Sequence, residues 1–291
     1  MSENQMVTRP KYETAALAAK QAFLKVSGKE EAWTKEAMFA LQILRGNAVL
    51  QKCSEQSIQN AVINLALTGA TLNPVVGQAY LVPRGGQCCL DFSYKGLAGI
   101  AMDSGSVKHI APRLVYVFDD FSYEEVNGDP MLKHRPSLDP PAEFTAGPEK
   151  FWDFLICGYV IATLHDGSKV ITQPLPKWKL EKAMKTSKTV KEGTPWRTHP
   201  DEMCLKTLVK HAYKLLPQTD RMSQAVAIIN EHEGLASVDR TQAAKQIMDR
   251  FPAAEDQPVD PEVVSGTPEP CEFCKREDGS HESACPMNEP E

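Results

Sequence analysis

The chain has 291 residues, 42% of them hydrophobic, so it is long enough to bury one large core or two small ones. No apolar run approaches the roughly 20 residues that a membrane-spanning helix needs, and residues 1–16 lack the apolar centre of a signal peptide. We therefore expect neither membrane insertion nor export. Five of the eight cysteines are scattered, which is typical of reduced thiols in a cytosol and not of a disulfide framework.

The formal net charge of −6 is unevenly distributed along the chain. Residues 251–291 contain 11 acidic side chains against two basic ones, which leaves 30 basic and 27 acidic residues in 1–250. Between 169 and 216 the positive excess is larger, with 11 lysines and arginines against 4 aspartates and glutamates. Binding to a polyanion requires a basic stripe of this kind, because each neutralised phosphate releases counterions.

The part of the chain before residue 69 is expected to be helical. Its apolar residues recur at helical spacing, as in Ile58, Val62 and Leu65. Alanine-rich helices with modest apolar faces usually pack on a neighbour, so we assign this region to packing or oligomerisation. The predicted helices are 12–27, closed by Gly28, then 30–52 and 57–68.

A hairpin is predicted within residues 69–100. Two short apolar strands, 79–82 and 88–93, flank Gly85-Gly86. Paired glycines supply the positive φ angles that a tight hairpin turn needs. Arg84 is therefore expected at the turn.

The second strand of the hairpin runs directly into Tyr94-Lys95-Gly96 and then into an apolar helical stretch that ends at Gly105. A cation and an aromatic at the boundary between two elements suit a phosphate and a base. The same residues are also typical of an ordinary helix start with an exposed lysine, so by themselves they leave both interpretations open.

Further strands are predicted after this helix. The run 107–118 is rich in β-branched residues, and Pro112 inside it favours an edge position or a bulge. Residues 128–150 contain seven prolines and glycines and no periodicity, which predicts a long loop. The remaining predicted strands are 121–126, followed by an Asn127-Gly128 turn, and 154–164 and 168–173, joined at Asp166-Gly167.

Two lysine-rich helices are predicted in the basic stripe, 174–187 and 200–216. Lys206, Lys210 and Lys214 recur every four residues and therefore form one row beside the buried face of the second helix. Such a row is commonly a solvated edge, but next to another lysine-rich helix it can equally line a groove. The lysines of the first helix are Lys177, Lys179, Lys182 and Lys185, the buried face of the second is Leu208, Val209, Ala212, Leu215 and Leu216, and a last helix is predicted at 220–232.

The end of the chain contains a separate motif, Cys271-x2-Cys274-x6-His281-x3-Cys285. Three thiolates and one imidazole make a tetrahedral zinc site with no open position, so we expect one structural zinc ion. A segment this short has no core of its own, and the metal would supply most of its folding free energy. The proline-rich, acidic residues that precede it predict disorder from 251.

No motif for nucleotide hydrolysis or nucleophilic catalysis is present. The sequence lacks G-x-x-x-x-G-K-[ST], which disfavours an ATP-driven strand-exchange protein. A Mg²⁺-dependent nuclease would need carboxylates placed to hold the metal against a phosphate. The only dense candidates are Asp119, Asp120, Glu124 and Glu125, in a segment typical of a solvated face. We therefore predict a protein without a catalytic centre and keep a nuclease as the weaker alternative.

Several ordered motifs resemble the RecT family of phage single-strand annealing proteins. They are GATLNPVVGQAYLVPRG, QCCLDFSYKGLAGIAMDSGSVKHI, VYVFDDFSYE, HDGSK, TPW and EMCLKTLVKHAYKLLP, which cover about 50–216 in register. Tyr94-Lys95-Gly96 match the family's GYKG motif, in which Ser93 replaces the first glycine. Trp196, and Lys206 in the KT of the long helix, are further family-like positions. The zinc-like tail departs from the family pattern.

The resemblance implies a fold and an activity. The implied fold is α+β, a compact core similar to RecT and Redβ with a β-β-β-α unit and flanking helices, ahead of a disordered acidic linker and a small zinc-knuckle-like module. The implied activity is ATP-independent binding and annealing of single-stranded DNA in phage homologous recombination and DNA repair, by rings or helical filaments of the protein. A single-strand binder that coats DNA without annealing it is the main alternative.

The resemblance and the composition together divide the chain into four regions. Residues 1–68 are the N-terminal helical region, 69–235 the DNA-annealing α+β core, 236–268 a linker, and 269–291 the zinc-binding module. The implied partners are single-stranded DNA, the annealed duplex intermediate, further copies of the chain, a phage 5′-to-3′ exonuclease and the host single-strand-binding protein, in the host cytoplasm and without a membrane. Besides zinc we expect Mg²⁺ to assist DNA binding, and no ATP.

DNA binding is assigned to basic and aromatic residues that the charge pattern and the resemblance single out. Lysines and arginines are expected to hold the backbone of one strand, which leaves the base edges free for pairing. No residue is assigned a catalytic role. The predicted DNA-binding residues are Arg84, Tyr94, Lys95, Lys108, Arg113, Lys182, Lys185, Lys188, Lys191, Trp196, Arg197, Lys206, Lys210 and Lys214.

Overall fold

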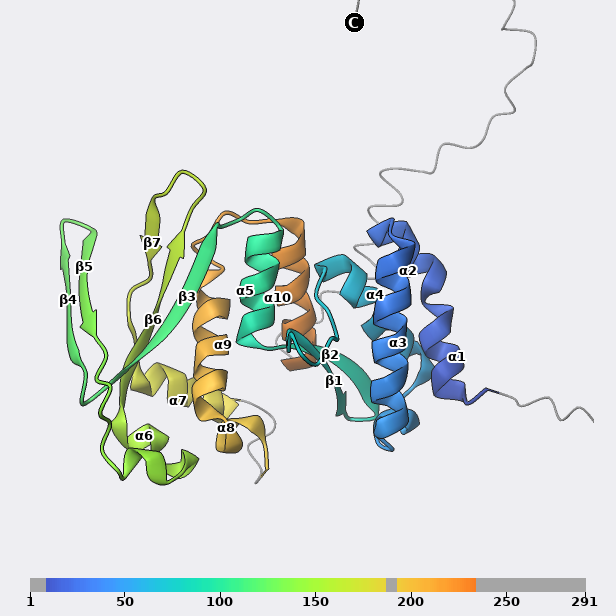
Figure 1. Cartoon of the computed structure of the whole chain (residues 1–291), viewed down its shortest axis with the longest axis horizontal. Helices are drawn as coiled ribbons and strands as arrows, with labels where there is room; N and C mark the ends of the chain where they lie inside the picture. Colours follow the sequence, from blue (N-terminus) through green and yellow to red (C-terminus); the bar gives the residue numbers. More distant parts are fainter. Residues whose placement is uncertain (1–8, 187–192, 234–291) are drawn as a thin grey trace, which may run out of the picture. The chain divides into compact units, whose positions relative to one another are not determined.

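The fold is known from a computed structural model, which describes residues 9–186 and 193–233 (Figure 1). These residues belong to the first of two compact units, Met1–Ser237. They combine helices with antiparallel sheets, so the predicted α+β class is confirmed. The predicted linker and zinc module lie outside the described residues. Within the described ranges, no helix is both long enough and apolar enough to cross a membrane.

The N-terminal helices are α1 (Lys11–Ala18), α2 (Lys20–Ser27), α3 (Glu30–Gly46) and α4 (Glu55–Thr68), with a short 3-10 turn at Leu50–Lys52. The helix predicted at 12–27 is divided at Ala19, and it ends at Gly28 as expected, since the left-handed φ of 64° there suits glycine. The apolar stripe of α4 is buried, and α4 packs against α1, α2 and the first sheet. These helices therefore form part of the same unit as the sheets.

The predicted hairpin is confirmed. Strands β1 (Ala79–Arg84) and β2 (Gln87–Phe92) pair antiparallel, and their turn is made by Gly85 and Gly86, whose φ angles are 56° and 79°. Two positive φ angles in a two-residue turn match the right-handed twist of the strands. Helix α5 (Tyr94–Asp103) follows within two residues of β2.

A second sheet has the strand order β3-β6-β7, from β3 (His109–Tyr116), β6 (Leu155–Thr163) and β7 (Lys169–Ile171), and β8 (Leu175–Pro176) also pairs with β6. Pro112 lies on β3, which in the described part of the chain pairs only with β6, so the predicted edge position is confirmed. The turn at Asp166-Gly167 joins β6 and β7 as predicted.

The prediction of a long loop at 128–150 is wrong for its first part. Residues Asp129–Arg135 form β5, which pairs with β4 (Asp120–Val126) through the predicted turn at Asn127 and Gly128. Leu132 of β5 packs with Phe121 against a small cluster on the second sheet. The rest of the predicted loop contains short helical turns at Phe144–Ala146 and Pro148–Lys150, and α6 (Phe151–Phe154) follows directly after it.

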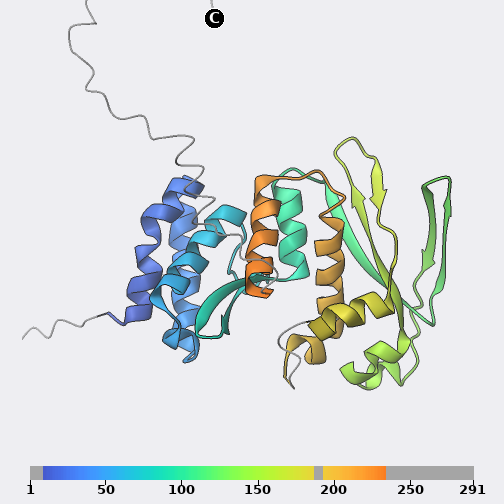
Figure 2. The ribbon, with the colours of Figure 1, turned by 180° about the vertical axis from the view of Figure 1, so that it is seen from behind.

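The remaining helices are α7 (Lys177–Thr186), α8 (Pro195–Thr198), α9 (Pro200–Ala212) and α10 (Asp220–Glu233). Helix α9 lies between the second sheet and α5, and α10 contacts α4, α5 and β2 (Figure 1). Figure 2 shows the same order from behind. Helix α9 ends four residues earlier than predicted, and Leu215 is exposed, whereas Leu208, Val209, Ala212 and Leu216 are buried as expected.

Candidate nucleic-acid interface

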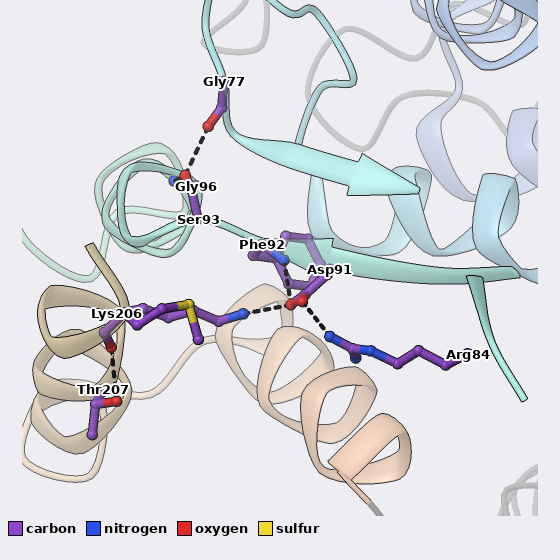
Figure 3. A network of polar contacts seen from close by, with 9 residues as sticks. Gly77, Arg84, Asp91, Phe92, Ser93, Gly96, Lys206 and Thr207 are labelled. Atoms are coloured by element: carbon purple, nitrogen blue, oxygen red, sulfur yellow. Dashed lines mark hydrogen bonds and ion pairs between the residues drawn. The ribbon is translucent and has the colours of Figure 1, made fainter. Parts of the chain in front are cut away.

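The junction between β2 and α5 is built by Ser93 and two glycines. The Ser93 hydroxyl accepts a hydrogen bond from the Gly96 N–H at 3.0 Å, which caps α5, and donates one to the Gly77 carbonyl at 2.7 Å (Figure 3). A Cβ atom on Gly96 would lie 2.1 Å from the carbonyl oxygen of Gln78. The glycine at this motif position is therefore explained by close backbone packing.

Tyr94 and Lys95, which lie between Ser93 and Gly96, are exposed to different degrees. Tyr94 is half-buried and packs against the core, and Lys95 is exposed, with its Nζ 5.8 Å from the centre of the Tyr94 ring. Lys95 is therefore placed where a ligand can reach it, and Tyr94 is placed mainly as its support.

Next to this junction, Asp91 of β2 holds two of the predicted DNA-binding cations. Arg84 Nη2 lies 2.6 Å from Oδ2 of Asp91, and Lys206 Nζ lies 2.5 Å from Oδ1, which also accepts the Phe92 N–H at 2.9 Å (Figure 3). The side chains of Lys206 and Asp91 are only 12% and 16% exposed. We call these three residues the Asp91 clamp; it joins the hairpin to α9.

The electrostatics of the clamp favour the charged state of Asp91. Burial by itself raises the pKa of this carboxyl, but the charges of Lys206 and Arg84, with the hydrogen bonds from Lys206 and the Phe92 N–H, lower it to about 2. Asp91 is therefore ionised at neutral pH, and the clamp carries a net charge of +1. Arg84 and Lys206, predicted as DNA contacts, are placed mainly to hold two elements together.

Most of the other predicted cations are exposed. Lys210 is half-buried on α9. Lys188 and Lys191 lie outside the described residues. The exposed members of the predicted set are Lys95, Lys108, Arg113, Lys182, Lys185, Arg197 and Lys214.

The structure does not support base stacking by Trp196. Its side chain is 5% exposed and lies in the core, with its ring centre 6.4 Å from that of Trp152 and nearly parallel to it. Phe92 is also buried in the core. Both rings pack within the protein.

An exposed aromatic that the sequence-based prediction missed is Trp178, in the first turn of α7. Its side chain is 60% exposed, and Lys179 Nζ lies 5.5 Å from its ring centre. The signal in the sequence is its spacing from Leu180, the buried residue of the helix, which places Trp178 about 160° away around the helix axis. Lys182 follows Trp178 by four residues and shares its exposed face.

Helices α7 and α9 pack against each other. Burial, together with the charges of Lys214 and Lys179, lowers the pKa of His211 on α9. Lys179 lies on α7 and Lys214 lies just after the end of α9, and both are close enough to His211 to disfavour its protonated form. The positive surface of α7 therefore continues to the end of α9. We call it the α7–α9 surface and define it by Trp178, Lys179, Lys182, Lys185 and Lys214.

The acidic residues considered for a nuclease are not arranged as a metal site. Asp119 accepts hydrogen bonds from the N–H groups of Tyr116 and Ser137 and contacts His134 Nε2 at 3.1 Å, while Asp120 pairs with Lys133 at 3.7 Å. In residues 9–186 and 193–233, no three His, Cys, Asp or Glu side chains are grouped so as to hold a metal ion. The predicted zinc ligands Cys271, Cys274, His281 and Cys285 lie outside these ranges.

Comparison with known proteins agrees with the motifs that surround this site. A model of the RecT family matches residues 33–247, which extends the region of resemblance on both sides. The chain is also similar to the protein RecT of Escherichia coli K12, with 28% identity over 193 residues, or 64% of this chain and 66% of the relative. The aligned region thus spans just under two thirds of the relative's length. With a family match over most of its length, the chain belongs to the RecT family.

Proposed function

We propose that this protein binds single-stranded DNA and anneals it to a complementary strand without nucleotide hydrolysis, in homologous recombination. Membership of the RecT family carries the proposal, because annealing is the activity that the family motifs imply. The exposed cations agree with it, since seven of the predicted DNA-binding residues are open to solvent on the described part of the molecule.

The proposed mechanism is physical. Exposed lysines and arginines neutralise the phosphates of one strand, which reduces its repulsion from the complement and keeps the base edges free. Duplex formation then releases about 1.4 kcal/mol per base-pair step, enough to drive pairing without ATP. The Asp91 clamp supports this surface indirectly, because it fixes the hairpin and the junction that carries Lys95 against α9.

The assembly and its partners belong to the same proposal. Rings or filaments of the chain would place the exposed cations of successive copies along one strand, and a phage origin would pair the protein with a 5′-to-3′ exonuclease and the host single-strand-binding protein in the host cytoplasm. Negative-stain images of the full chain with and without an oligonucleotide test the assembly: rings or filaments are expected, and discrete monomers on DNA would contradict it.

We further propose that the C-terminal motif binds one structural zinc ion, on the strength of its ligand types and spacing. Elemental analysis of the purified full chain is expected to find one zinc per chain, and Cys274→Ser is expected to lose it. Since none of the cations assigned to DNA binding lies in this module, annealing by residues 1–250 should persist. Mg²⁺ is proposed to assist DNA binding, which titrations with and without the metal test.

One assay separates annealing from its alternatives. Two complementary oligonucleotides, one of them labelled, are mixed with and without the protein in the absence of ATP. Faster duplex formation supports annealing, whereas binding without acceleration identifies a coating protein. Shortening of the labelled strand that requires Mg²⁺ and stops with EDTA identifies a nuclease.

A further inference from the structure

Trp178 exposes a large apolar surface that the fold does not use. An indole that leaves 60% of its surface in water forgoes most of the stabilisation that burial gives a side chain of this size. By contrast, Trp33 and Trp196 are buried in the core. The position of Trp178 therefore contributes little to the stability of the described unit.

The residues around Trp178 on α7 are cationic. Lys182 and Lys185 follow it by four and seven residues, so the three side chains share one exposed face of the helix. Lys179 reaches the ring itself, with its Nζ 5.5 Å from the ring centre. The single acidic residue of α7, Glu181, is 3.9 Å from Lys177, one turn earlier on the same helix.

An exposed aromatic ring within a row of lysines has the chemistry that single-stranded nucleic acid requires. Every base has a π-face, so stacking on an indole is tolerant of sequence, and flanking cations follow the phosphates. An anionic protein partner would use the lysines but would gain nothing specific from a flat aromatic face. Duplex DNA would use the lysines too, but its bases are already stacked on one another.

We propose that Trp178 is a stacking platform for a base of single-stranded DNA, with Lys179, Lys182 and Lys185 holding the adjoining phosphates. This inference rests on the proposed function and adds to it that helix α7 contacts the bases. Helix α9 packs against α7, and Lys214 is exposed just after the end of α9, so the strand can continue from α7 toward the end of α9.

The test uses the full chain and an oligothymidylate, with binding followed by intrinsic tryptophan fluorescence and, independently, by the anisotropy of a labelled oligonucleotide. A stacked base quenches an indole. We expect DNA to quench the wild-type protein and to quench Trp178→Phe much less, while the phenylalanine ring preserves most of the affinity. Trp178→Ala and Trp178→Leu should bind about 5- to 150-fold more weakly, the range that loss of one stacked base implies.

Leu138→Ala is the matched control, because it also removes an exposed apolar side chain but from a segment outside α7, and its affinity should equal that of the wild type. Circular dichroism checks that every variant is folded. Wild-type affinity in both Trp178→Ala and Trp178→Leu, with quenching retained in Trp178→Phe, would overturn the stacking role and leave the proposed function standing. A wild-type protein that neither binds nor anneals would overturn both.

Discussion

At the scale of single residues, Asp91 has a larger role than the sequence suggests. It places one carboxylate between two cations from different elements, Arg84 beside the turn of the hairpin and Lys206 on α9. A half-buried lysine needs a partner, and breaking a buried ion pair leaves an uncompensated charge. Lys206, a family-like position on sequence grounds, is therefore expected to act first on stability and only through that on DNA binding.

Replacing Asp91 tests this role. Asp91→Asn should lower the free energy of unfolding, measured by urea denaturation, because both cations lose their counter-charge. The loss should be about 3 kcal/mol, the lower end of the range for breaking a buried ion pair, since the clamp is partly exposed. Lys206→Met keeps the apolar stem of the side chain and removes its charge, and the double variant should lose clearly less than the two single losses combined. Losses that simply add would show that the two residues are not coupled.

The same carboxyl makes stability depend on pH. Its folded pKa of about 2 lies below the value of about 3.9 expected in the unfolded chain, so its contribution is complete above about pH 4 and is lost as the pH falls toward 2. The shift corresponds to roughly 3 kcal/mol. Between pH 5 and 2 the wild type should therefore lose more stability than Asp91→Asn, and parallel curves would contradict the lowered pKa.

The close packing of Gly96 can be tested by comparing the stability of Gly96→Ala with that of Gly46→Ala. Gly96→Ala should cost stability at the upper end of about 1–3 kcal/mol, because the new methyl would lie 2.1 Å from a backbone carbonyl oxygen of Gln78. Gly46→Ala, at the end of α3, meets no atom within 4 Å and should leave stability unchanged or slightly raised. Equal thermal midpoints for the two variants would mean that Gly96 is not packed as described.

Local sequence does not predict which of two tryptophans is exposed. Trp178 and Trp196 both stand next to a cation in the basic stripe, and their local sequences do not separate them. Trp196 is buried because α8 sets it against Trp152, a residue from a distant segment. That contact is tertiary, and no local periodicity records it. The family-like position of Trp196 is accounted for by packing in the core.

At the scale of elements, the predictions that relied on turn chemistry are confirmed. Gly85-Gly86, Asn127-Gly128 and Asp166-Gly167 each form a turn at the predicted place, since positive φ angles there favour these residue types. The sequence does not predict strand β5, because its half-buried face consists of Pro130, Leu132 and His134. A proline, a leucine and a histidine do not produce the alternation of apolar and polar residues that marks a strand. Strand β5 is recognisable only through its pairing with β4.

At this scale, the prediction for DNA binding concerns helix α7. The double variant Lys182→Ala, Lys185→Ala should weaken binding of oligothymidylate and reduce the slope of log K against log salt by about 1.4, since each lost phosphate contact on a single strand removes about 0.7. The control is Lys35→Ala, an exposed lysine of α3 that is paired with Glu31. A slope unchanged from the wild type would remove α7 from the DNA path.

At the scale of the whole molecule, the charge is divided by region, with a basic stripe at 169–216 and an acidic segment after it. The net charge of −6 masks the basic stripe, because the acidic residues are concentrated after 250. The stripe indicated a polyanion partner, and ordered motifs indicated the family. Neither revealed that two of the assigned cations, Arg84 and Lys206, are tied to Asp91, since the three residues are brought together only by the packing of α9 beside the hairpin.

The most direct test of annealing measures the rate at which two complementary strands, each with one member of a fluorescence-transfer pair, form a duplex without ATP. The full chain should raise this rate well above that of free DNA, and added salt should diminish the effect as phosphate contacts are screened. The Lys182→Ala, Lys185→Ala variant should accelerate it less than Lys35→Ala. A rate equal to that of free DNA, at protein concentrations that saturate the strand, would contradict the account.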